Sequence, residues 1–209
     1  MHKGYFMSED SIEMMNSYMP SAYKQGDVGE VITASELRSL GMNVIRNLYF
    51  PYKDRFTEVD MIGISAFGIF IVENKNYTGK VVGNINDKYW NVNYSMFNNA
   101  RLLNPVLQNE LHKSVIVPLI KSNFDSIDEK YIFRPVIFND KCELSIKNSE
   151  KDVFTLSRFK NVYSSYAENG KEVISSDYQL KLYDFLCSFS NISDLMRLLH
   201  VVLMKGTDI

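Results

Sequence analysis

The apolar and polar positions between residues 57 and 75 predict the element around which the rest of the chain is arranged. Two short apolar runs, residues 59–64 and 69–72, are separated by the sequence Ser-Ala-Phe-Gly. This segment has the composition of a hairpin turn, and its glycine can adopt a positive φ. The pattern therefore predicts a β-hairpin. Its second strand is apolar at every position and is expected to be buried on both faces.

The register of this hairpin decides which side chains meet at its open end. If Ile64 pairs with Ile69, alternation along the strands places Asp60 opposite Glu73, with Lys75 on the same face. Like charges that face each other across an antiparallel pair repel, so a positive group is expected there. Mg²⁺ takes oxygen ligands and commonly uses only one or two carboxylates. The hairpin thus predicts a divalent-cation site.

A helix is predicted before the hairpin, over residues 27–40, and Gly41 is typical of the position just past a helix end. Glu30, Ala34 and Leu37 follow one another at i, i+4 and i+7, so Glu30 begins the stripe that faces the interior. A glutamate in a first turn can also serve only to complement the helix dipole. The spacing leaves both interpretations of Glu30 open.

A second helix is predicted after the hairpin, because Asn104 caps well and Pro105 suits the first helical position. Pro118 is expected to end or kink this helix. Gln108 opens an otherwise apolar stripe along one side of it. The amide is either a supporting polar group at a site or simply a satisfied buried or half-exposed residue. His112 is interpreted as a packing or solvated residue, since no second histidine or cysteine stands at ligand spacing.

The remaining patterns predict short strands and further helices. Strands are predicted at residues 43–50, 80–83, 88–92, 130–138, 142–146 and 153–156, and helices at 11–18, 157–168, 177–189 and 193–204. We therefore expect an α/β (α+β) protein in which an N-terminal arm, residues 1–20, precedes a core over residues 21–140. Residues 141–209 are expected to pack on that core.

Composition and charge limit the classes of function. The 209 residues carry a formal net charge of −2, so no global positive field indicates a nucleic-acid binder, although a local patch or bound cation can hold phosphates. Cys142 and Cys187 belong to no CxxC or Cys/His cluster, which predicts a reducing cytoplasm and no structural zinc. No apolar run approaches signal-peptide or membrane-span length, so no membrane association is expected.

The ordered set of an inward glutamate, a strand aspartate, Glu-x-Lys on the next strand and a polar-headed helix resembles the PD-(D/E)xK nuclease core. Within that superfamily the chain resembles the nuclease-related domain (NERD) family over roughly residues 21–139. The matching segments are GDVGE at 26–30, EVD at 58–60, GIFIVENKNYTG at 68–79, Trp90 and NPVLQ at 104–108. One departure is that Glu58-Val59 precedes Asp60 where a proline is typical.

The resemblance implies a restriction-endonuclease-like fold, in which a central mixed sheet is flanked by helices. The catalytic residues that it implies are Glu30, Asp60, Glu73, Lys75 and Gln108. We expect the metal, Mg²⁺ or Mn²⁺, to be bound by Asp60, Glu73 and the carbonyl of Asn74, with Glu30 available for a second ion. Lys75 would orient or polarise the attacking water.

The leading hypothesis is a divalent-metal-dependent nuclease that hydrolyses DNA. A second hypothesis is a non-catalytic nucleic-acid-binding module, favoured by the acidic balance and by the lack of a lysine or arginine run. A third is an interaction protein whose C-terminal helices bind a protein partner or a second copy of the chain. Fold analogy alone does not choose among them.

Overall fold

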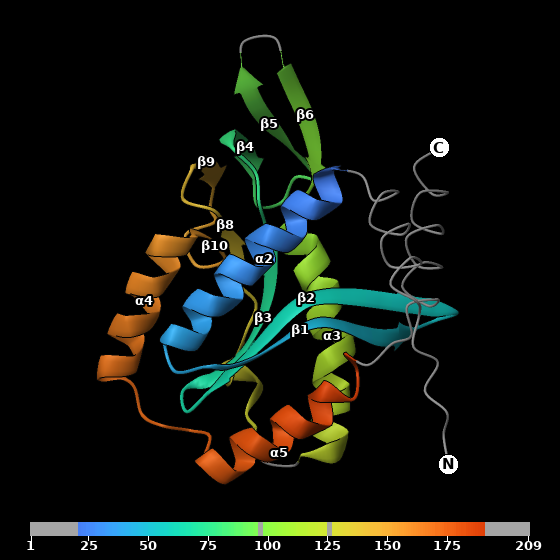
Figure 1. The fold of residues 1–209 in the computed structure, drawn as a ribbon, viewed down its shortest axis with the longest axis vertical. Coiled ribbons are helices and arrows are strands. Elements are labelled where there is room, and N and C mark those ends of the chain that lie inside the picture. The colour runs from blue at the N-terminus through green and yellow to red at the C-terminus, as the bar shows by residue number, and fades with distance from the viewer. Residues whose placement is uncertain (1–20, 96–97, 125–126, 191–209) are drawn as a thin grey trace, which may run out of the picture.

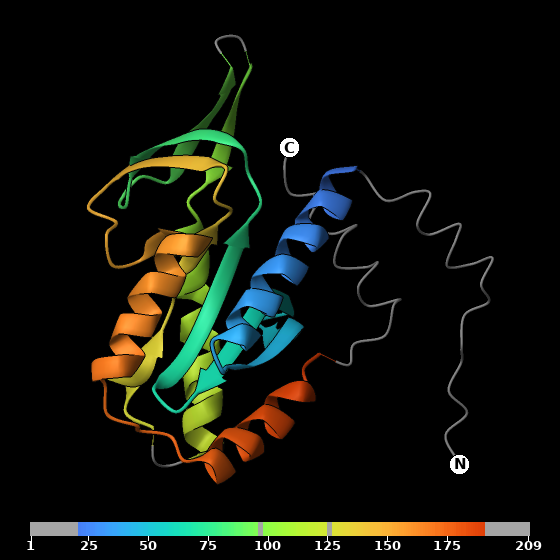
Figure 2. The same ribbon diagram turned by 60° about the vertical axis from the view of Figure 1, so that its left-hand side comes forward.

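The computed structural model describes residues 21–95, 98–124 and 127–190, and these form two β-sheets with helices packed around them (Figures 1 and 2). The elements are α2 (Ser21–Ser39), β1 (Asn43–Tyr52), β2 (Arg55–Ser65), β3 (Gly68–Lys75), β4 (Gly79–Asn84), β5 (Tyr89–Ser95), β6 (Asn98–Leu103), α3 (Pro105–Asn123), the 3-10 helix η1 (Glu129–Tyr131), β7 (Ile132–Phe133), β8 (Val136–Phe138), β9 (Cys142–Lys147), β10 (Val153–Thr155), α4 (Leu156–Asn169) and α5 (Ser176–Cys187). This composition confirms the predicted α+β class. The helices predicted at 11–18 and 193–204, and the N-terminal arm, lie outside the described residues.

The larger sheet has six strands in the order β1-β2-β3-β8-β10, with β7 also paired to β3. Strands β1, β2 and β3 are antiparallel, whereas β7, β8 and β10 run parallel to their neighbours, so the sheet is mixed. The smaller sheet has the order β6-β5-β4-β9. Its β5–β6 arm extends beyond the rest of the chain at the top of Figure 1.

The β2–β3 hairpin has the register that the sequence predicts. Ile64 pairs with Ile69 and Ser65 with Gly68, which leaves a two-residue turn. Gly68 has a φ of 151°, and a Cβ atom there would lie 2.6 Å from the Tyr131 carbonyl oxygen, so only glycine fits. Strand β3 is buried from Gly68 through Glu73, which confirms the expectation that both of its faces are covered.

Three apolar clusters hold the helices to the sheets. Ile116 of α3 and Leu182 of α5 pack on one face of the larger sheet, and Leu37 of α2 and Phe159 of α4 pack on the other. The third cluster lies under the smaller sheet around Trp90, which is fully buried and donates from Nε1 to the Asn84 carbonyl oxygen at 2.8 Å. None of the helices in the described ranges combines the length and apolar character that a membrane span requires.

Several element boundaries differ from the sequence-based predictions. Helix α2 begins at Ser21, six residues before the predicted start, and α3 continues past Pro118 to Asn123. Pro118 is exposed, while Ile116, Val117 and Ile120 around it are buried, so tertiary packing outweighs the single lost backbone hydrogen bond. The strand predicted at 130–138 is divided into β7 and β8 by the Arg134-Pro135 segment.

Asn104 connects the start of α3 to the smaller sheet. Its buried side chain accepts a hydrogen bond from the Val106 N–H and donates to the carbonyl oxygens of Ile85 and Asp87, each at 2.7 Å. We expect Asn104→Ala to lower the free energy of unfolding by about 2 kcal/mol, because a cap and two buried hydrogen bonds are lost. Urea denaturation measures the loss.

Ser175→Ala is the matched control for this prediction. Ser175 caps α5 by accepting from the Tyr178 N–H and supports no second segment through its side chain within the described ranges. Its replacement should cost about 1 kcal/mol. Equal losses in the two variants would show that Asn104 contributes as a cap only.

Candidate active site

Asp60, Glu73 and Lys75 come together where β2 and β3 separate. The β2–β3 ladder ends at the pair Met61–Val72, and β3 then continues beside β8, with Glu73 paired to Val136. At this branch point the carboxylate of Asp60 accepts a hydrogen bond from the backbone N–H of Asn74 at 2.7 Å. The open end of the hairpin therefore places the two carboxylates side by side.

Strand β1 is also irregular beside Asp60. Arg46 pairs with Met61 and Leu48 with Val59, so Asn47 stands opposite Asp60, and Asn47 has a φ of 55°. A non-glycine residue in this region costs of order 1 kcal/mol, and asparagine tolerates it better than most residues. Asp60 is therefore absent from the regular strand pairing with β1 and from that with β3.

Glu73 and Lys75 form a buried ion pair. The Nζ atom of Lys75 lies 2.6 Å from Oε1 of Glu73, and the two side chains are 17% and 3% exposed, respectively. The second carboxylate oxygen of Glu73, Oε2, is buried and makes no hydrogen bond within the described ranges. A buried carboxylate oxygen without a hydrogen bond is costly, so a cation that bound this atom would remove the cost.

The charges of these three groups depend on one another. Burial and the negative charge of Glu73 raise the pKa of Asp60 well above its ordinary value, although Lys75 opposes the rise. Burial by itself would lower the pKa of Lys75, but the charges of Glu73 and Asp60 outweigh it, so that pKa is raised. Lys75 is therefore a fixed cation at neutral pH rather than a base.

Glu30 of α2 affects Asp60 through its charge. Its negative charge contributes to the raised pKa of Asp60, and burial raises the pKa of Glu30 itself above its usual range. Arg46 of β1 holds Glu30, with 3.1 Å between Nη2 and Oε2, and also contacts Asp27 at 2.7 Å. Ala34 and Leu37 of the predicted stripe are fully buried, which confirms the inward face of α2.

Asn74 faces α2 with its side chain, in contrast to its neighbours Glu73 and Lys75. Its Oδ1 atom accepts a hydrogen bond from the Thr33 hydroxyl at 2.7 Å, and its N–H is bound to Asp60. Asn74 also pairs with Ile137 of β8. Both helix α2 and strand β2 therefore constrain Asn74, the residue whose carbonyl is the expected metal ligand.

Helix α3 presents Asn109 and His112 to the site, whereas Gln108 is half-buried. The Asn109 amide donates to the carbonyl oxygens of Ile71 and Pro135 at 2.9 and 3.1 Å. The Pro135 carbonyl also accepts a hydrogen bond from the Glu73 N–H, so Asn109 stabilises the place where β3 and β8 begin to pair. No hydrogen bond among described residues connects Gln108 to the other candidate residues.

His112 is buried, with its Nδ1 atom 3.4 Å from Oε2 of Glu73. Burial lowers the pKa of His112, although Glu73 opposes the change, so the imidazole is neutral. The prediction that Gln108 begins the inward-facing stripe of α3 was wrong, because the buried face is displaced by one residue around the helix. The buried residues are Val106, Asn109, His112, Ile116, Val117 and Ile120. Counting back from Ile116 and Ile120 at helical spacing leads to Asn109 and His112, but the sequence does not favour this face of the helix over the one that begins at Gln108.

Arg46 was also missed by sequence reasoning. It stands alone as a cation in the apolar strand segment NVIRNLYF, and that isolation is the only local indication of a role. What makes it part of the site is its pairing with Glu30, sixteen residues earlier in the chain.

The donor atoms fit a hard divalent cation. Asp60 and Glu73 are adjacent carboxylates, and Oε2 of Glu73 makes no hydrogen bond within the described ranges. In the same part of the chain, no three His, Cys, Asp or Glu side chains are grouped as a metal-binding cluster. A metal at this site would therefore take its other ligands from the backbone and from water, as Mg²⁺ often does.

The mixed sheet and the cluster at its branch point define an α+β protein with a nuclease-like core. A family model described as the nuclease-related domain matches residues 25–139, just over half of the chain. The chain therefore belongs to the nuclease-related domain family. An uncharacterized protein of Bacillus anthracis is 28% identical over 153 residues, which cover 69% of this chain and 68% of that protein. No solved structure matches.

Proposed function

We propose that the chain is a divalent-metal-dependent nuclease of the PD-(D/E)xK type that hydrolyses phosphodiester bonds in DNA. The observation that carries this proposal is the branch point of β2 and β3, where Asp60, Glu73 and Lys75 meet. Two carboxylates and a fixed cation are the groups that metal-assisted phosphodiester hydrolysis needs. Free cysteines at positions 142 and 187 support a cytoplasmic location.

Asp60 and Glu73 would hold Mg²⁺ or Mn²⁺ together with the Asn74 carbonyl, and Glu30 is the candidate ligand for a second ion. When bound, the metal supplies Lewis acidity and lowers the pKa of a bound water. The protonated Nζ of Lys75 would donate a hydrogen bond to the attacking water or to a phosphoryl oxygen.

Three further residues would support these groups from their surroundings. Asn109 fixes the peptide of Glu73 through Pro135, and His112 packs against the carboxylate. Arg46 orients Glu30 and balances part of the negative charge. Gln108 is a fourth candidate for a supporting role: it is half-buried and follows directly after the first turn of α3, next to Asn109 in the sequence.

The proposal is tested by incubating supercoiled plasmid and linear DNA with the purified protein in Mg²⁺ or Mn²⁺. Cleavage should require the metal and disappear with EDTA. It should also disappear in the double variant Asp60→Ala/Lys75→Ala. Lys80→Ala/Glu143→Ala is the matched control, because it removes an ion pair of the same 2.6 Å separation from the smaller sheet. Cleavage that is equal in both variants, or absent from wild type on every substrate, would refute the proposal.

A non-catalytic nucleic-acid-binding module is the second candidate. The net charge of −2 favours it, as does the pairing of Lys75 and Arg46 with carboxylates, because these cations are then less available to phosphate. Salt-dependent DNA binding without cleavage would select this function. The plasmid assay and a gel-shift titration on the same protein separate the two candidates.

A further inference from the structure

A cavity of about 440 Å³ lies on the face of β3 opposite to Glu73, between the larger sheet and α4. Side chains alternate along β3, so Phe70 points into this cavity while Ile71 and Glu73 point towards α3. Six aromatic residues line it: Phe70, Phe133, Phe154, Phe159, Tyr163 and Tyr166. The proposed metal site uses none of them.

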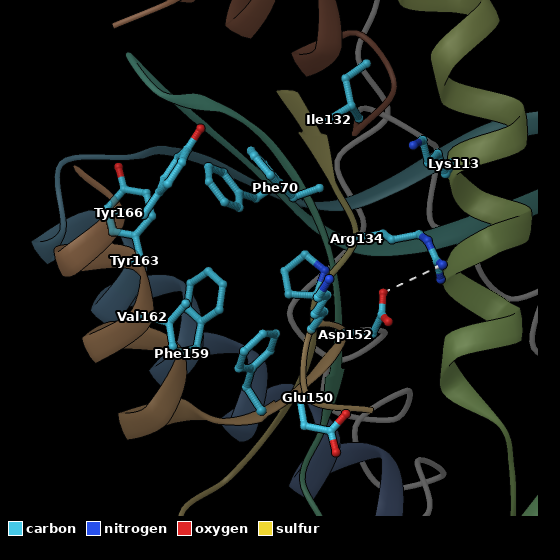
Figure 3. A pocket seen from close by; sticks show the side chains of 14 residues that line it. Phe70, Lys113, Ile132, Arg134, Glu150, Asp152, Phe159, Val162, Tyr163 and Tyr166 are labelled. Carbon is cyan, nitrogen blue, oxygen red and sulfur yellow. Dashed lines mark ion pairs between the residues drawn. The ribbon is translucent and has the colours of Figure 1, made fainter. Parts of the chain in front are cut away.

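The rings form two walls that meet at nearly a right angle. Phe70 stacks on Phe133 with centroids 4.9 Å apart, and Phe159 lies nearly parallel to Tyr163. Between the walls, Phe70 and Tyr163 are edge to face at 5.4 Å and 80°. Figure 3 shows the α4 rings on one side of the open space. A flat ring could lie against one wall with its edge towards the other, an arrangement that aromatic groups prefer.

Charged side chains border the other side of the cavity. Lys113, Arg134 and Lys151 are its cations, and Glu150 and Asp152 are its anions. Lys113 also lies 3.5 Å from Glu129, whereas Lys151 forms no ion pair within the described ranges. Arg134 contacts Asp152 through Nη2 at 3.6 Å, as the dashed line in Figure 3 marks.

The guanidinium of Arg134 has hydrogen-bonding capacity left over. Nη2 also lies 3.1 Å from Glu110, but the buried Nη1 atom has no hydrogen-bond partner within the described ranges. A guanidinium with an unused donor suits a phosphate group, because it can donate a charge-assisted hydrogen bond to a phosphate oxygen. The cavity therefore combines an aromatic interior with two groups at its border that an anion can contact, Lys151 and the guanidinium of Arg134.

We propose that this cavity binds a mononucleotide, with its base against the aromatic lining and its phosphate at Arg134 and Lys151. The volume lies within the range of small-molecule sites, which are mostly apolar with a few polar groups that orient the ligand. The choice of a nucleotide among aromatic anions rests on the proposed nuclease function, whose reaction concerns the same chemical class. The site itself is separate from the metal site and needs no metal.

Isothermal titration calorimetry of the full chain with dAMP in EDTA tests the proposal. Val162→Trp should weaken binding by roughly tenfold or more, because Val162 lines the cavity, is 48% exposed and can accept a larger side chain that fills the space. Leu180→Trp is the matched control on α5: Leu180 is 58% exposed and lies outside the cavity, so binding should be unchanged.

Arg134→Gln tests the contact with the phosphate separately from the contact with the base. It should weaken dAMP binding about tenfold and leave the affinity for deoxyadenosine unchanged, because only the phosphate contact is lost. Asp60→Asn should bind dAMP as wild type does, and Val162→Trp should cleave plasmid as wild type does, so failure of either proposal is seen independently.

Three results would overturn the inference. The first is no heat from wild type up to about 1 mM dAMP. The second is binding that Val162→Trp leaves intact, or that inorganic phosphate reproduces at the same affinity. The third is loss of binding in Asp60→Asn, which would place the nucleotide at the metal site instead.

Discussion

Replacing Lys75 by methionine is expected to lower the rate of metal-dependent DNA cleavage by about 10²- to 10⁴-fold. Lys75 is the cation that lies against Glu73 at 2.6 Å, and its raised pKa keeps it protonated throughout the neutral range. Methionine retains the length of the side chain but not its charge. Cleavage of plasmid at saturating Mg²⁺, followed in single-turnover experiments, measures the loss in the chemical step.

The control for this variant is Lys80→Met. Lys80 is an exposed lysine of β4 that also lies 2.6 Å from a glutamate, Glu143, so the substitution removes an equivalent ion pair away from the site. It should leave the cleavage rate unchanged. DNA affinity in Ca²⁺ should fall little in Lys75→Met, since Lys75 is paired with Glu73 and is therefore less available to phosphate. A cleavage rate within about tenfold of wild type would assign catalysis to other groups.

Because Lys75→Met leaves Glu73 buried without its ion pair, the variant should also be less stable in the absence of metal. Circular dichroism and thermal denaturation must therefore accompany the kinetic measurement. Lys75→Arg provides a further readout: it keeps the charge and should restore folding, while the bulkier, planar group restores only part of the rate.

Replacing Asp60 by asparagine is expected to stabilise the metal-free protein and to abolish its stabilisation by Mg²⁺. Burial and the charge of Glu73 raise the pKa of Asp60, so its ionised form disfavours folding. Asparagine removes that charge and can still accept the hydrogen bond from the Asn74 N–H. We expect a gain of about 0.5–2 kcal/mol without metal, as is common when a functional site is relieved of charge repulsion.

The stabilisation that Mg²⁺ provides should be lower in Asp60→Asn than in wild type. A ligand at 100 times its dissociation constant stabilises a protein by about 2.7 kcal/mol if it binds only the folded state. Wild type should show this increase in Mg²⁺, whereas Asp60→Asn should show almost none. Chemical denaturation of both proteins, in EDTA and in Mg²⁺, gives the four free energies. An equal metal-induced increase in the two proteins would remove Asp60 from the ligand set.

The difference in stability between metal-free wild type and Asp60→Asn should also depend on pH. A carboxyl whose pKa is raised by folding contributes stability that is fully present below its ordinary pKa of about 3.9 and is lost as the pH rises through the folded-state value. Metal-free wild type should therefore lose stability relative to Asp60→Asn as the pH is raised from acid towards neutrality. The difference should level off once Asp60 is fully ionised.

Asp140→Asn is a control in which the pKa shift of the replaced carboxyl has the opposite sign. Burial tends to raise the pKa of Asp140, but hydrogen bonds from the backbone and hydroxyl of Ser157 outweigh it, so the pKa is lowered. Its contribution to stability is present above its ordinary pKa and disappears as the pH falls through the folded-state value. Asp140→Asn should therefore destabilise the protein at neutral pH.

The register of the β2–β3 hairpin was predictable from the sequence, whereas the inward face of α3 was not. The pairing of Ile64 with Ile69 follows from a short turn and two apolar runs, so the positions of Asp60 and Glu73 were predictable. The inward face of α3 was not, because its apolar residues are compatible with two rotations about the helix axis. Only contact with β3 and β8 selects the rotation that buries Asn109 and His112.

The sequence by itself determined the local features of this protein: the hairpin and its register, the inward stripe of α2 and the cap at Asn104. Each depends on residues within a few positions of one another, where side-chain period and turn chemistry act directly. The tertiary structure alone decided the change of partner of β3 from β2 to β8, the pairing of Arg46 with Glu30 and the cavity beneath α4. These features arise from contacts between distant segments, whose geometry depends on how all the layers pack together.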